Sequence, residues 1–454
     1  MIILSYRTFL VCTDIRMEGK KSCYEKGNSE MKLLVVGGGG REHAIIKKLK
    51  ENKNVEEIFA LPGNGGIAAD ATCVDIGAKD IEGIVKFAKE QKIDFAVVAP
   101  DDPLVLGCVD ALQEAGIPAF GPNKAAAIIE GSKVFSKNLM KKYGIPTAQY
   151  EVFTDEKAAL EYLETCPIPT VIKADGLALG KGVIIAETRE EAKDAVVSMM
   201  EEKIFGESGS NIVIEEFLTG PEVSVLSFTD GNIVVPMVSS MDHKRALDGD
   251  KGLNTGGMGT VAPNPYYTKE VADRCMKEIF LPTIEAMKKE GREFRGCLYF
   301  GLMITESGPK VIEYNCRFGD PETQVVLPLL DSDLLDIMMA TADGKLTEDM
   351  VQFADDSACC VVMASEGYPK SYEKGFPITV DDDFEGILYI AGAKKKEDGT
   401  VVTNGGRVLG VVSRKASLQE AVEEAYRQVE KVHFDNAYYR KDIGAKALAA
   451  KEAK

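Results

Sequence analysis

The sequence predicts a multidomain protein of the α/β and α+β classes, and three observations lead to this prediction. The chain has 454 residues, which is too long for one hydrophobic core, because domains usually hold roughly 100–200 residues. Strand-like and helix-like segments alternate from residue 31 to about residue 122, which favours an open parallel sheet. The last part combines short strand-like runs with a long helical run at 417–432, which is typical of a small α+β domain.

The N-terminal alternation consists of buried strands and amphipathic helices in turn. Strands are expected at 32–40, 55–64, 93–100 and 117–122, and helices at 41–52, 81–92 and 109–116. Ligands of such sheets bind beyond the carboxyl ends of the strands, and the glycine- and proline-rich segments 37–40, 62–66 and 100–103 fall there. A dinucleotide fingerprint is not met, because its third glycine would fall on Glu42 or His43 and no acid ends the second strand.

Composition excludes several classes of function. The net charge of −18 argues against a general nucleic-acid or anionic-membrane surface, because such partners need a basic face. The ten cysteines include no C-x-x-C pair and there are only three histidines, so a zinc site is poorly supported and reduced thiols are expected. Residues 1–30 lack the features of a signal peptide, and we expect a dispensable extension before Met31.

A glycine-rich flap is predicted at residues 171–186, "VIKADGLALGKGVIIA". Gly176 and Gly180 are too close for a Walker loop, and Gly182 follows Lys181 where a hydroxyl residue belongs. Because a β-branched run follows, the segment joins strand to strand. Its glycines and Lys173 suit the binding of phosphates, whereas the alternative is a surface hairpin with solvated lysines.

The segment 309–324, "PKVIEYNCRFGDPETQ", predicts a metal site. If residues 311–315 form a strand, Glu313 and Asn315 lie on one face, and two oxygen ligands of this kind suit Mg²⁺ beside phosphates. Arg317 follows within reach. The alternative is a strand end with surface charges.

Two further segments carry weaker signals. The run 212–225 contains a polar break that could bind adenine through its backbone and ribose through Glu222, although alone it is better explained as a hairpin. The loop 239–259 gathers Asp242, His243, Lys244 and Arg245, which suggests an anionic substrate or else a solvated loop. Together the four segments indicate ATP-dependent phosphoryl transfer with an undefined acceptor.

These residues resemble the ATP-grasp superfamily and, within it, the family of glycinamide ribonucleotide synthetases (phosphoribosylamine–glycine ligases). The resemblance runs from Met31 to about Gly444. It rests on the motifs "GGGGREHA", "PGNGG", "EGSKVFSK", "IKADGLALGKGV", "IEEFLTGPEVS", "DHKR", "NTGGMG", "EYNCRFGDPETQ" and "VTNGGRVLGV". It implies an open parallel pre-ATP-grasp domain at 31–132, an ATP-grasp domain at 133–354 with a mobile lid at about 151–215, and a C-terminal α+β domain at 355–454.

The resemblance also implies a reaction in purine biosynthesis. ATP, glycine and 5-phosphoribosylamine would give glycinamide ribonucleotide, ADP and phosphate through glycyl phosphate, with Mg²⁺ or Mn²⁺ as the metal. Arg317 and Lys173 are the implied catalytic residues, and Glu313 and Asn315 the implied metal ligands. The implied ATP-binding residues are Lys133, Lys173, Gly176, Gly180, Lys181, Gly182, Glu215, Glu216, Phe217, Leu218 and Glu222. The implied substrate-binding residues are Gly38, Gly39, Gly40, Arg41, Glu42, Asp242, Lys244, Arg245, Asn254, Gly257, Met258, Asp320 and Glu322.

The sequence departs from the family pattern at two places. Ala99 and Asp101 stand where the family usually has glycine and glutamate, which puts a contact to the amine substrate in doubt, and Leu253 replaces a common proline. The competing hypotheses are an ATP-grasp ligase with another amine acceptor and a nucleotide-binding scaffold without catalysis. We expect a cytoplasmic monomer that acts on small molecules and binds neither nucleic acid nor membrane.

Overall fold

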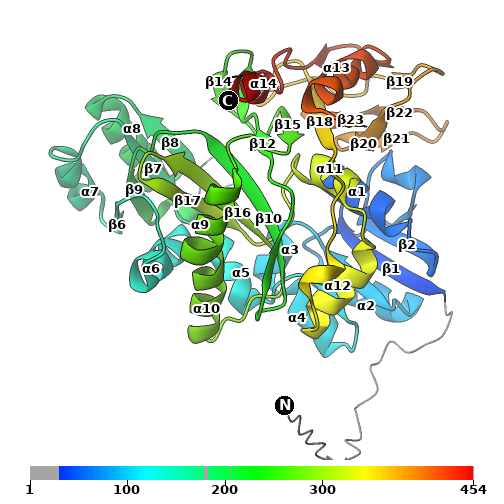
Figure 1. The fold of residues 1–454 in the computed structure, drawn as a ribbon, viewed down its shortest axis with the longest axis horizontal. Helices are drawn as coiled ribbons and strands as arrows, with labels where there is room; N and C mark the ends of the chain where they lie inside the picture. Colours follow the sequence, from blue (N-terminus) through cyan, green and yellow to red (C-terminus); the bar gives the residue numbers. More distant parts are fainter. Residues whose placement is uncertain (1–29, 178–181, 205, 453–454) are drawn as a thin grey trace, which may run out of the picture.

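The N-terminal segment forms a five-stranded parallel sheet in the order β3-β2-β1-β4-β5. Figure 1 labels β1 and β2 of this sheet. The computed structural model describes residues 30–177, 182–204 and 206–452 and confirms the α/β and α+β multidomain class. The strands are β1 (Met31–Gly37), β2 (Val55–Pro62), β3 (Thr72–Cys73), β4 (Phe95–Val98) and β5 (Ala119–Phe120). The helices are α1 (Gly40–Leu49), α2 (Ile81–Gln91), α3 (Asp101–Leu106), α4 (Cys108–Glu114) and α5 (Lys124–Gly131).

Helix α3 is an element that the sequence analysis did not predict. The sequence analysis placed residues 100–103 beyond the carboxyl end of a strand and assigned no helix to them. In the structure, Asp101 and Asp102 occupy the first turn of this short helix, where acidic side chains stabilise the helix dipole. Gly107 ends the helix with a φ of +97°, a conformation that glycine adopts without strain. The helix therefore begins at the carboxyl end of β4 and fixes the direction of Asp101.

A second, separate layer is the antiparallel sheet β6-β9-β7-β8, which lies apart from the parallel sheet in Figure 1. It contains β6 (Tyr150–Phe153), β7 (Thr170–Ala174), β8 (Val183–Ala186) and β9 (Ile212–Glu216), with helices α7 (Glu156–Leu163) and α8 (Arg189–Met200). These elements enclose their own apolar core, to which Leu163, Ile172 and Val196 belong. The flap segment joins β7 to β8, as predicted, while Gly180 and Lys181 lie outside the described residues.

The third sheet is antiparallel and has the order β11-β10-β16-β17. Its strands are β10 (Glu222–Thr229), β11 (Val234–Pro236), β16 (Gly296–Thr305) and β17 (Gly308–Asn315). The helices of this region are α6 (Lys133–Tyr143), α9 (Lys269–Cys275), α10 (Leu281–Lys289), α11 (Thr323–Val326) and α12 (Leu334–Asp343). Strand β17 confirms the strand predicted at 311–315, and its Tyr314 side chain is buried while Glu313 and Asn315 are partly exposed.

The C-terminal sheet draws strands from two distant parts of the chain. Its order is β12-β15-β18-β23-β20, with β25 paired to β18. The strands are β12 (Met241–Asp242), β15 (Gly259–Ala262), β18 (Ser357–Ser365), β20 (Ile387–Ile390), β23 (Arg407–Lys415) and β25 (Ala437–Tyr438), and α13 (Leu418–Val429) and α14 (Ala445–Glu452) accompany them. The boundaries at 132 and 354 stay predictions, and residue 354 falls between β15 and β18, which are neighbours in this sheet.

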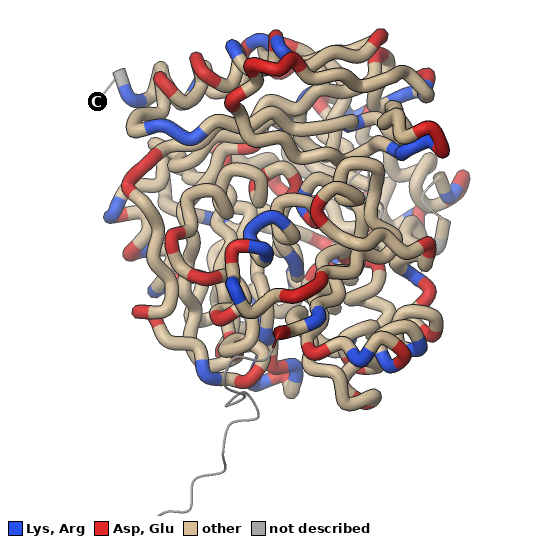
Figure 2. The backbone as a smooth tube through the Cα atoms, turned by 90° about the vertical axis from the view of Figure 1, so that its right-hand side faces the viewer, with Lys and Arg blue, Asp and Glu red and all other residues tan. Residues whose placement is uncertain are grey.

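Short two-stranded hairpins complete the fold. They pair β13 (Arg245–Leu247) with β14 (Lys251–Asn254), β19 (Thr379–Val380) with β24 (Val432–His433), and β21 (Ala393–Lys395) with β22 (Val401–Thr403). Both signs of charge are interspersed along the backbone in the view of Figure 2. Within the described ranges, no helix has the length and apolar character that a membrane crossing requires.

A buried histidine links the β12–β15 region to the C-terminal segment. The Nδ1 atom of His243 lies 3.1 Å from the Gly259 carbonyl oxygen, and its Nε2 accepts a hydrogen bond of 3.2 Å from the Gly444 amide. The acceptor role of Nε2 requires a neutral ring. Burial lowers the pKa of His243 to about 4, and the charge of Arg440 acts in the same direction.

We predict a pH-dependent loss of stability that His243 causes. Its unfolded pKa is about 6.5, so the neutral ring contributes fully above that pH, and the contribution is lost as the pH falls from about 6.5 towards about 4. Between about pH 7.5 and pH 5.5 the free energy of unfolding in urea should fall by about 1 kcal/mol more for the wild-type protein than for His243→Gln. Equal pH dependences for the two proteins would contradict this account.

Candidate active site

The parallel sheet places two loops together at its carboxyl edge. Strand β2 follows β1 in sequence and lies on one side of it, whereas β4 lies on its other side. The direction in which successive strands are added therefore reverses between β1 and β4. Gly38–Gly40 follow β1, and Asp101 follows β4. A reversal of this kind opens the crevice in which α/β sheets bind ligands.

The glycine turn after β1 is held by a carboxylate from its own helix. Glu42 is 1% exposed, and its Oε2 accepts a hydrogen bond of 2.6 Å from the Gly39 amide. Its Oε1 accepts one of 2.7 Å from Arg41 Nε, and Arg41 Nη1 donates to the Phe318 carbonyl at 3.1 Å. In this structure the Glu42 carboxylate orients Arg41 and accepts the hydrogen bond of the Gly39 amide. The contact between Glu42 and substrate therefore stays a prediction.

Arg317 lies at the junction of this crevice with β17. Its Nη2 is 3.1 Å from Glu130 Oε1 and 3.2 Å from Asn315 Oδ1, and its Nη1 donates to the Phe318 carbonyl at 3.2 Å. The Arg317 Nε–H is buried and has no hydrogen-bond partner among the described residues. An oxygen of a bound anion would satisfy this donor.

Asp101 faces the same arginines. Burial on its own would raise the pKa of Asp101, but the guanidinium groups of Arg317 and Arg41 outweigh that effect and lower the pKa. These charges favour the ionised form of Asp101, which stands where the resemblance noted above implies a glutamate.

A buried ion cluster joins the sheet of β7 and β9 to α6. Glu215 lies between two lysines, with its Oε1 3.0 Å from Lys173 Nζ and its Oε2 2.9 Å from Lys137 Nζ. Lys173 also donates to the Ile312 carbonyl at 3.1 Å. Burial lowers the pKa of Lys137 to about 8, although Glu215 opposes this shift. The sequence analysis quoted the motif that contains Lys137 but assigned no role to this residue.

The base of the flap is fixed to the start of α6. Lys133 Nζ donates to the Gly176 carbonyl at 2.6 Å, and the Ser132 hydroxyl donates to Asp175 at 3.0 Å. Asp175 Oδ1 also accepts hydrogen bonds from the backbone amides of Val134 and Gly176. Burial lowers the pKa of Lys133, although the charges of Glu313 and Asp175 oppose this shift.

The structure brings the predicted metal ligands together on β17. The carboxylate of Glu313 is partly exposed, and Asn315 presents its amide oxygen to Arg317. Gly301 lies opposite Glu313 in the sheet, and a Cβ there would lie 3.1 Å from Glu313 Cγ. Lys244 Nζ lies 3.9 Å from Glu313 Oε1 and 2.9 Å from Glu222 Oε2, so this lysine lies between the two carboxylates.

A group of acidic side chains lies beside these cations. Burial raises the pKa of both Asp242 and Glu322, and the charge of Glu322 raises that of Asp242 further. Glu322 Oε1 lies 3.2 Å from the Tyr299 hydroxyl, which is 2.8 Å from the Ser224 hydroxyl. A pair of carboxyl groups of this kind suits a ligand that carries hydroxyl or amino groups.

Arg407 from β23 connects the acidic group with a glycine loop. Its Nη1 donates to the carbonyls of Gly256 at 2.6 Å and Asp320 at 2.9 Å, and its Nη2 lies 3.3 Å from Asp320 Oδ2. A Cβ at Gly257 would lie 2.6 Å from Asp242 Oδ1, so the loop packs directly on the acidic group. The sequence analysis quoted the motif that contains Arg407 but assigned no role to it.

Several predicted residues lie at the margin or away from this centre. Arg245 is on the exposed β13–β14 hairpin and donates to the Gly252 carbonyl, with Asn254 as its partner in register. Met258 is fully buried, and its backbone forms hydrogen bonds with the backbones of His243 and Val362. Glu216, Phe217 and Leu218 follow at the end of β9, where Phe217 is 36% exposed.

Models of one protein family match nearly the whole described chain. The N domain of phosphoribosylglycinamide synthetase matches residues 31–130, the ATP-grasp (A) domain residues 131–323 and the C domain residues 358–446. The phosphoribosylamine–glycine ligase of Clostridium acetobutylicum is 48% identical over 414 residues, which covers 91% of this chain and 99% of that protein. That of Caldanaerobacter subterraneus subsp. tengcongensis is 49% identical and covers 91% and 100%.

Solved structures agree with these matches. The phosphoribosylamine–glycine ligase of Thermotoga maritima superposes with a TM-score of 0.80 at 36% identity and covers 91% of this chain and 100% of that one. The biotin carboxylase domain of Hydrogenobacter thermophilus 2-oxoglutarate carboxylase shares the fold, with a TM-score of 0.71 at 17% identity over 92% of this chain and 93% of that one. The chain therefore belongs to the phosphoribosylglycinamide synthetase family, with N, ATP-grasp and C domains in succession.

Proposed function

We propose that this protein joins glycine to 5-phosphoribosylamine in an ATP-driven reaction that gives glycinamide ribonucleotide, ADP and phosphate for purine biosynthesis. Relatives that are 48% and 49% identical bear the name phosphoribosylamine–glycine ligase. The observation that carries the proposal is the arrangement of two adjoining charge environments. Cations surround the Glu313–Asn315 pair, and the carboxyl groups of Asp242 and Glu322 lie beside them.

The cationic environment suits the phosphates of ATP. Burial on its own would raise the pKa of Glu313, but Lys244, Lys173, Lys133 and Arg317, in that order of strength, lower it, so four cations act on one carboxylate. A phosphate chain would balance this positive charge in a setting of reduced dielectric. The glycines at the flap base and the end of β9 would then lie next to the phosphates and the adenine, respectively.

The ligands on β17 fit a divalent cation. Among the described residues, no group of three His, Cys, Asp or Glu side chains could hold a metal by itself. Mg²⁺ needs no such cage when it binds beside phosphates, because one or two protein oxygens suffice. Glu313 and Asn315 would hold Mg²⁺ or Mn²⁺, and the ion would neutralise phosphate charge during transfer.

The reaction proceeds by two transfers. A carboxylate oxygen of glycine attacks the γ-phosphorus of ATP, the bond to the β-phosphate oxygen breaks, and ADP leaves. The nitrogen of phosphoribosylamine then attacks the acyl carbon of glycyl phosphate, loses a proton, and displaces inorganic phosphate. Arg317 is the residue that we propose stabilises the charge on the transferring group, because Glu130 and the Phe318 carbonyl already fix its guanidinium.

The alternatives make different demands on the site. A ligase for another amine would keep the cationic environment but would respond to a different acceptor. A scaffold without catalysis would not need an Arg317 that Glu130 and the Phe318 carbonyl hold in place. The cytoplasmic location and the monomeric state stay predictions, and light scattering on the purified protein would test the latter.

Omission of single components tests the proposed function. We expect ADP release with Mg-ATP, glycine and phosphoribosylamine generated from ribose 5-phosphate and ammonia, and no release when any one of them is left out. Arg317→Ala should lower kcat by about 10²–10³, the usual loss when one preorganised donor is removed. ADP formation that does not depend on glycine or phosphoribosylamine would contradict the assignment.

The position of Lys173 should depend on the charge of Glu215. Glu215→Gln leaves the buried ammonium groups of Lys137 and Lys173 without their shared carboxylate, which should cost about 3–5 kcal/mol in the free energy of unfolding. The matched control is Glu216→Gln, the next residue on β9, whose ion pair with Lys310 is partly exposed. It should cost less than about 1 kcal/mol in urea unfolding. Equal losses for the two variants would show that Glu215 does not hold the lysines.

A further inference from the structure

The turn of the β13–β14 hairpin is bonded to the C-terminal segment at nearly every position. The Tyr438 hydroxyl donates to the Ala246 carbonyl at 2.8 Å, and the Lys441 amide donates to Asp248 Oδ1 at 2.8 Å. The Gly249 amide donates to Asp442 Oδ2 at 2.8 Å. These bonds cross almost two hundred residues of sequence, so they fix the hairpin to a segment far from the metal ligands in the chain.

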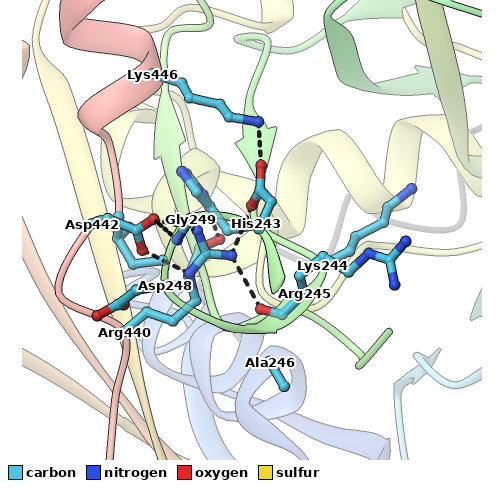
Figure 3. Close-up of polar contacts among 12 residues, drawn as sticks. His243, Lys244, Arg245, Ala246, Asp248, Gly249, Arg440, Asp442 and Lys446 are labelled. Atoms are coloured by element: carbon cyan, nitrogen blue, oxygen red, sulfur yellow. Dashed lines mark hydrogen bonds and ion pairs between the residues drawn. The ribbon is translucent and has the colours of Figure 1, made fainter. Parts of the chain in front are cut away.

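Arg440 is the centre of this attachment (Figure 3). Its side chain is 1% exposed, and its Nε and Nη2 donate to the two oxygens of Asp442 at 2.7 and 2.8 Å. Its Nη1 donates both to the Arg245 carbonyl at 3.0 Å and to Asp250 Oδ1 at 2.9 Å. The guanidinium therefore clamps both ends of the hairpin turn to the C-terminal segment.

Lys244 directly precedes Arg245, and its side chain extends to the proposed ATP site. On one side of Lys244, the His243 side chain accepts a hydrogen bond from the Gly444 amide. On the other side, the Arg245 carbonyl accepts a hydrogen bond from Arg440. The C-terminal segment therefore holds the His243 side chain on one side of Lys244 and the Arg245 backbone carbonyl on the other. The Lys244 ammonium in turn lies 2.9 Å from Glu222 and 3.9 Å from Glu313.

Stability alone does not account for a fully buried guanidinium. Desolvation of such a charge is costly, and an apolar side chain of similar size often stabilises a protein at least as well. The guanidinium provides directed bonds instead, because its planar donors meet two carboxylates and a carbonyl at fixed angles. This geometry sets the position of the hairpin more narrowly than apolar packing would.

We infer that Arg440 is a positioning residue for the ligase reaction, acting through Lys244 on the groups that bind Mg-ATP. The inference rests on the proposed function, because Glu222 and Glu313 are the proposed ribose and metal ligands. When the clamp is weakened, Lys244 no longer holds a fixed place between these carboxylates. Binding of the nucleotide then suffers, while the acidic group that Asp242 and Glu322 form keeps its own contacts.

The test is a double-mutant cycle with Arg440→Lys and Lys244→Met. Arg440→Lys keeps the positive charge but removes the planar set of N–H donors that binds both oxygens of Asp442. The KM for Mg-ATP should therefore rise about tenfold, while the KM for glycine stays within about twofold of the wild type. In the Lys244→Met background the same Arg440→Lys change should have almost no further effect on the KM for Mg-ATP. A simple loss of folding would instead be additive and would affect both substrates.

Lys446→Met is the matched control. Lys446 also forms an ion pair with Asp250, but it approaches from the solvent side with a 67% exposed side chain. It should leave all kinetic constants within about twofold of the wild type, because exposed pairs contribute little. If the Arg440→Lys protein does not fold, the Asp442→Asn variant is used instead, because it weakens the same two hydrogen bonds between Arg440 and residue 442.

Titration calorimetry with Mg-ADP separates this inference from the proposed function. If the wild-type protein binds Mg-ADP but forms no product, the proposed function is contradicted and the inference on Arg440 is not. The double-mutant cycle would then compare the dissociation constants of the variants for Mg-ADP. Unchanged nucleotide binding and KM in Arg440→Lys would overturn the role of Arg440. Additive effects of the two substitutions would overturn the connection through Lys244.

Discussion

The site depends on one backbone carbonyl, that of Phe318, which accepts hydrogen bonds from two arginines. Arg41 approaches it from the N-terminus of α1, and Arg317 approaches it from the end of β17. The two guanidinium groups would repel each other without Asp101 and Glu130 nearby, which supply negative charge from α3 and α5. The parallel sheet and the antiparallel sheet of β17 are therefore joined where the chemistry is proposed to occur.

The same physical constraint recurs around the rest of the site. Several deeply buried charges have a partner from a different element, as in Glu215 with Lys137 and Lys173, or Arg440 with Asp250. Breaking such a pair leaves an uncompensated charge in a poorly solvated place, so each pair fixes the relative position of two elements. The sheet of β7 and β9 has its own apolar core, and these pairs attach it to α6 and β17.

The sequence was informative where a local rule was sufficient. The period of two along a strand placed Glu313 and Asn315 together on β17, and the alternation of segments predicted the parallel sheet. Both follow from short-range geometry. The short helix α3 was missed, because residues 100–103 were placed beyond the carboxyl end of a strand and assigned no helix, although their two acids favour a helix start.

Long-range partners could not be predicted in this way. Lys137, Arg407 and Arg440 looked like ordinary basic residues, and their roles appear only when α6, β23 and the C-terminal segment meet their distant neighbours. For Glu42 the sequence suggested too much. Its place in the glycine motif implied a substrate contact, but its carboxylate accepts hydrogen bonds from the Gly39 amide and Arg41. The pairing of β15 with β18 likewise has no local signal.

The central claim is that the cationic environment around Glu313 promotes conversion of the glycine carboxylate into glycyl phosphate, a mixed carboxylic–phosphoric anhydride. The most direct measurement uses glycine labelled with ¹⁸O in both carboxylate oxygens and mass spectrometry of the inorganic phosphate formed in one turnover. The account predicts one labelled oxygen in each phosphate and one retained in the product amide. Unlabelled phosphate formed together with glycinamide ribonucleotide would contradict it.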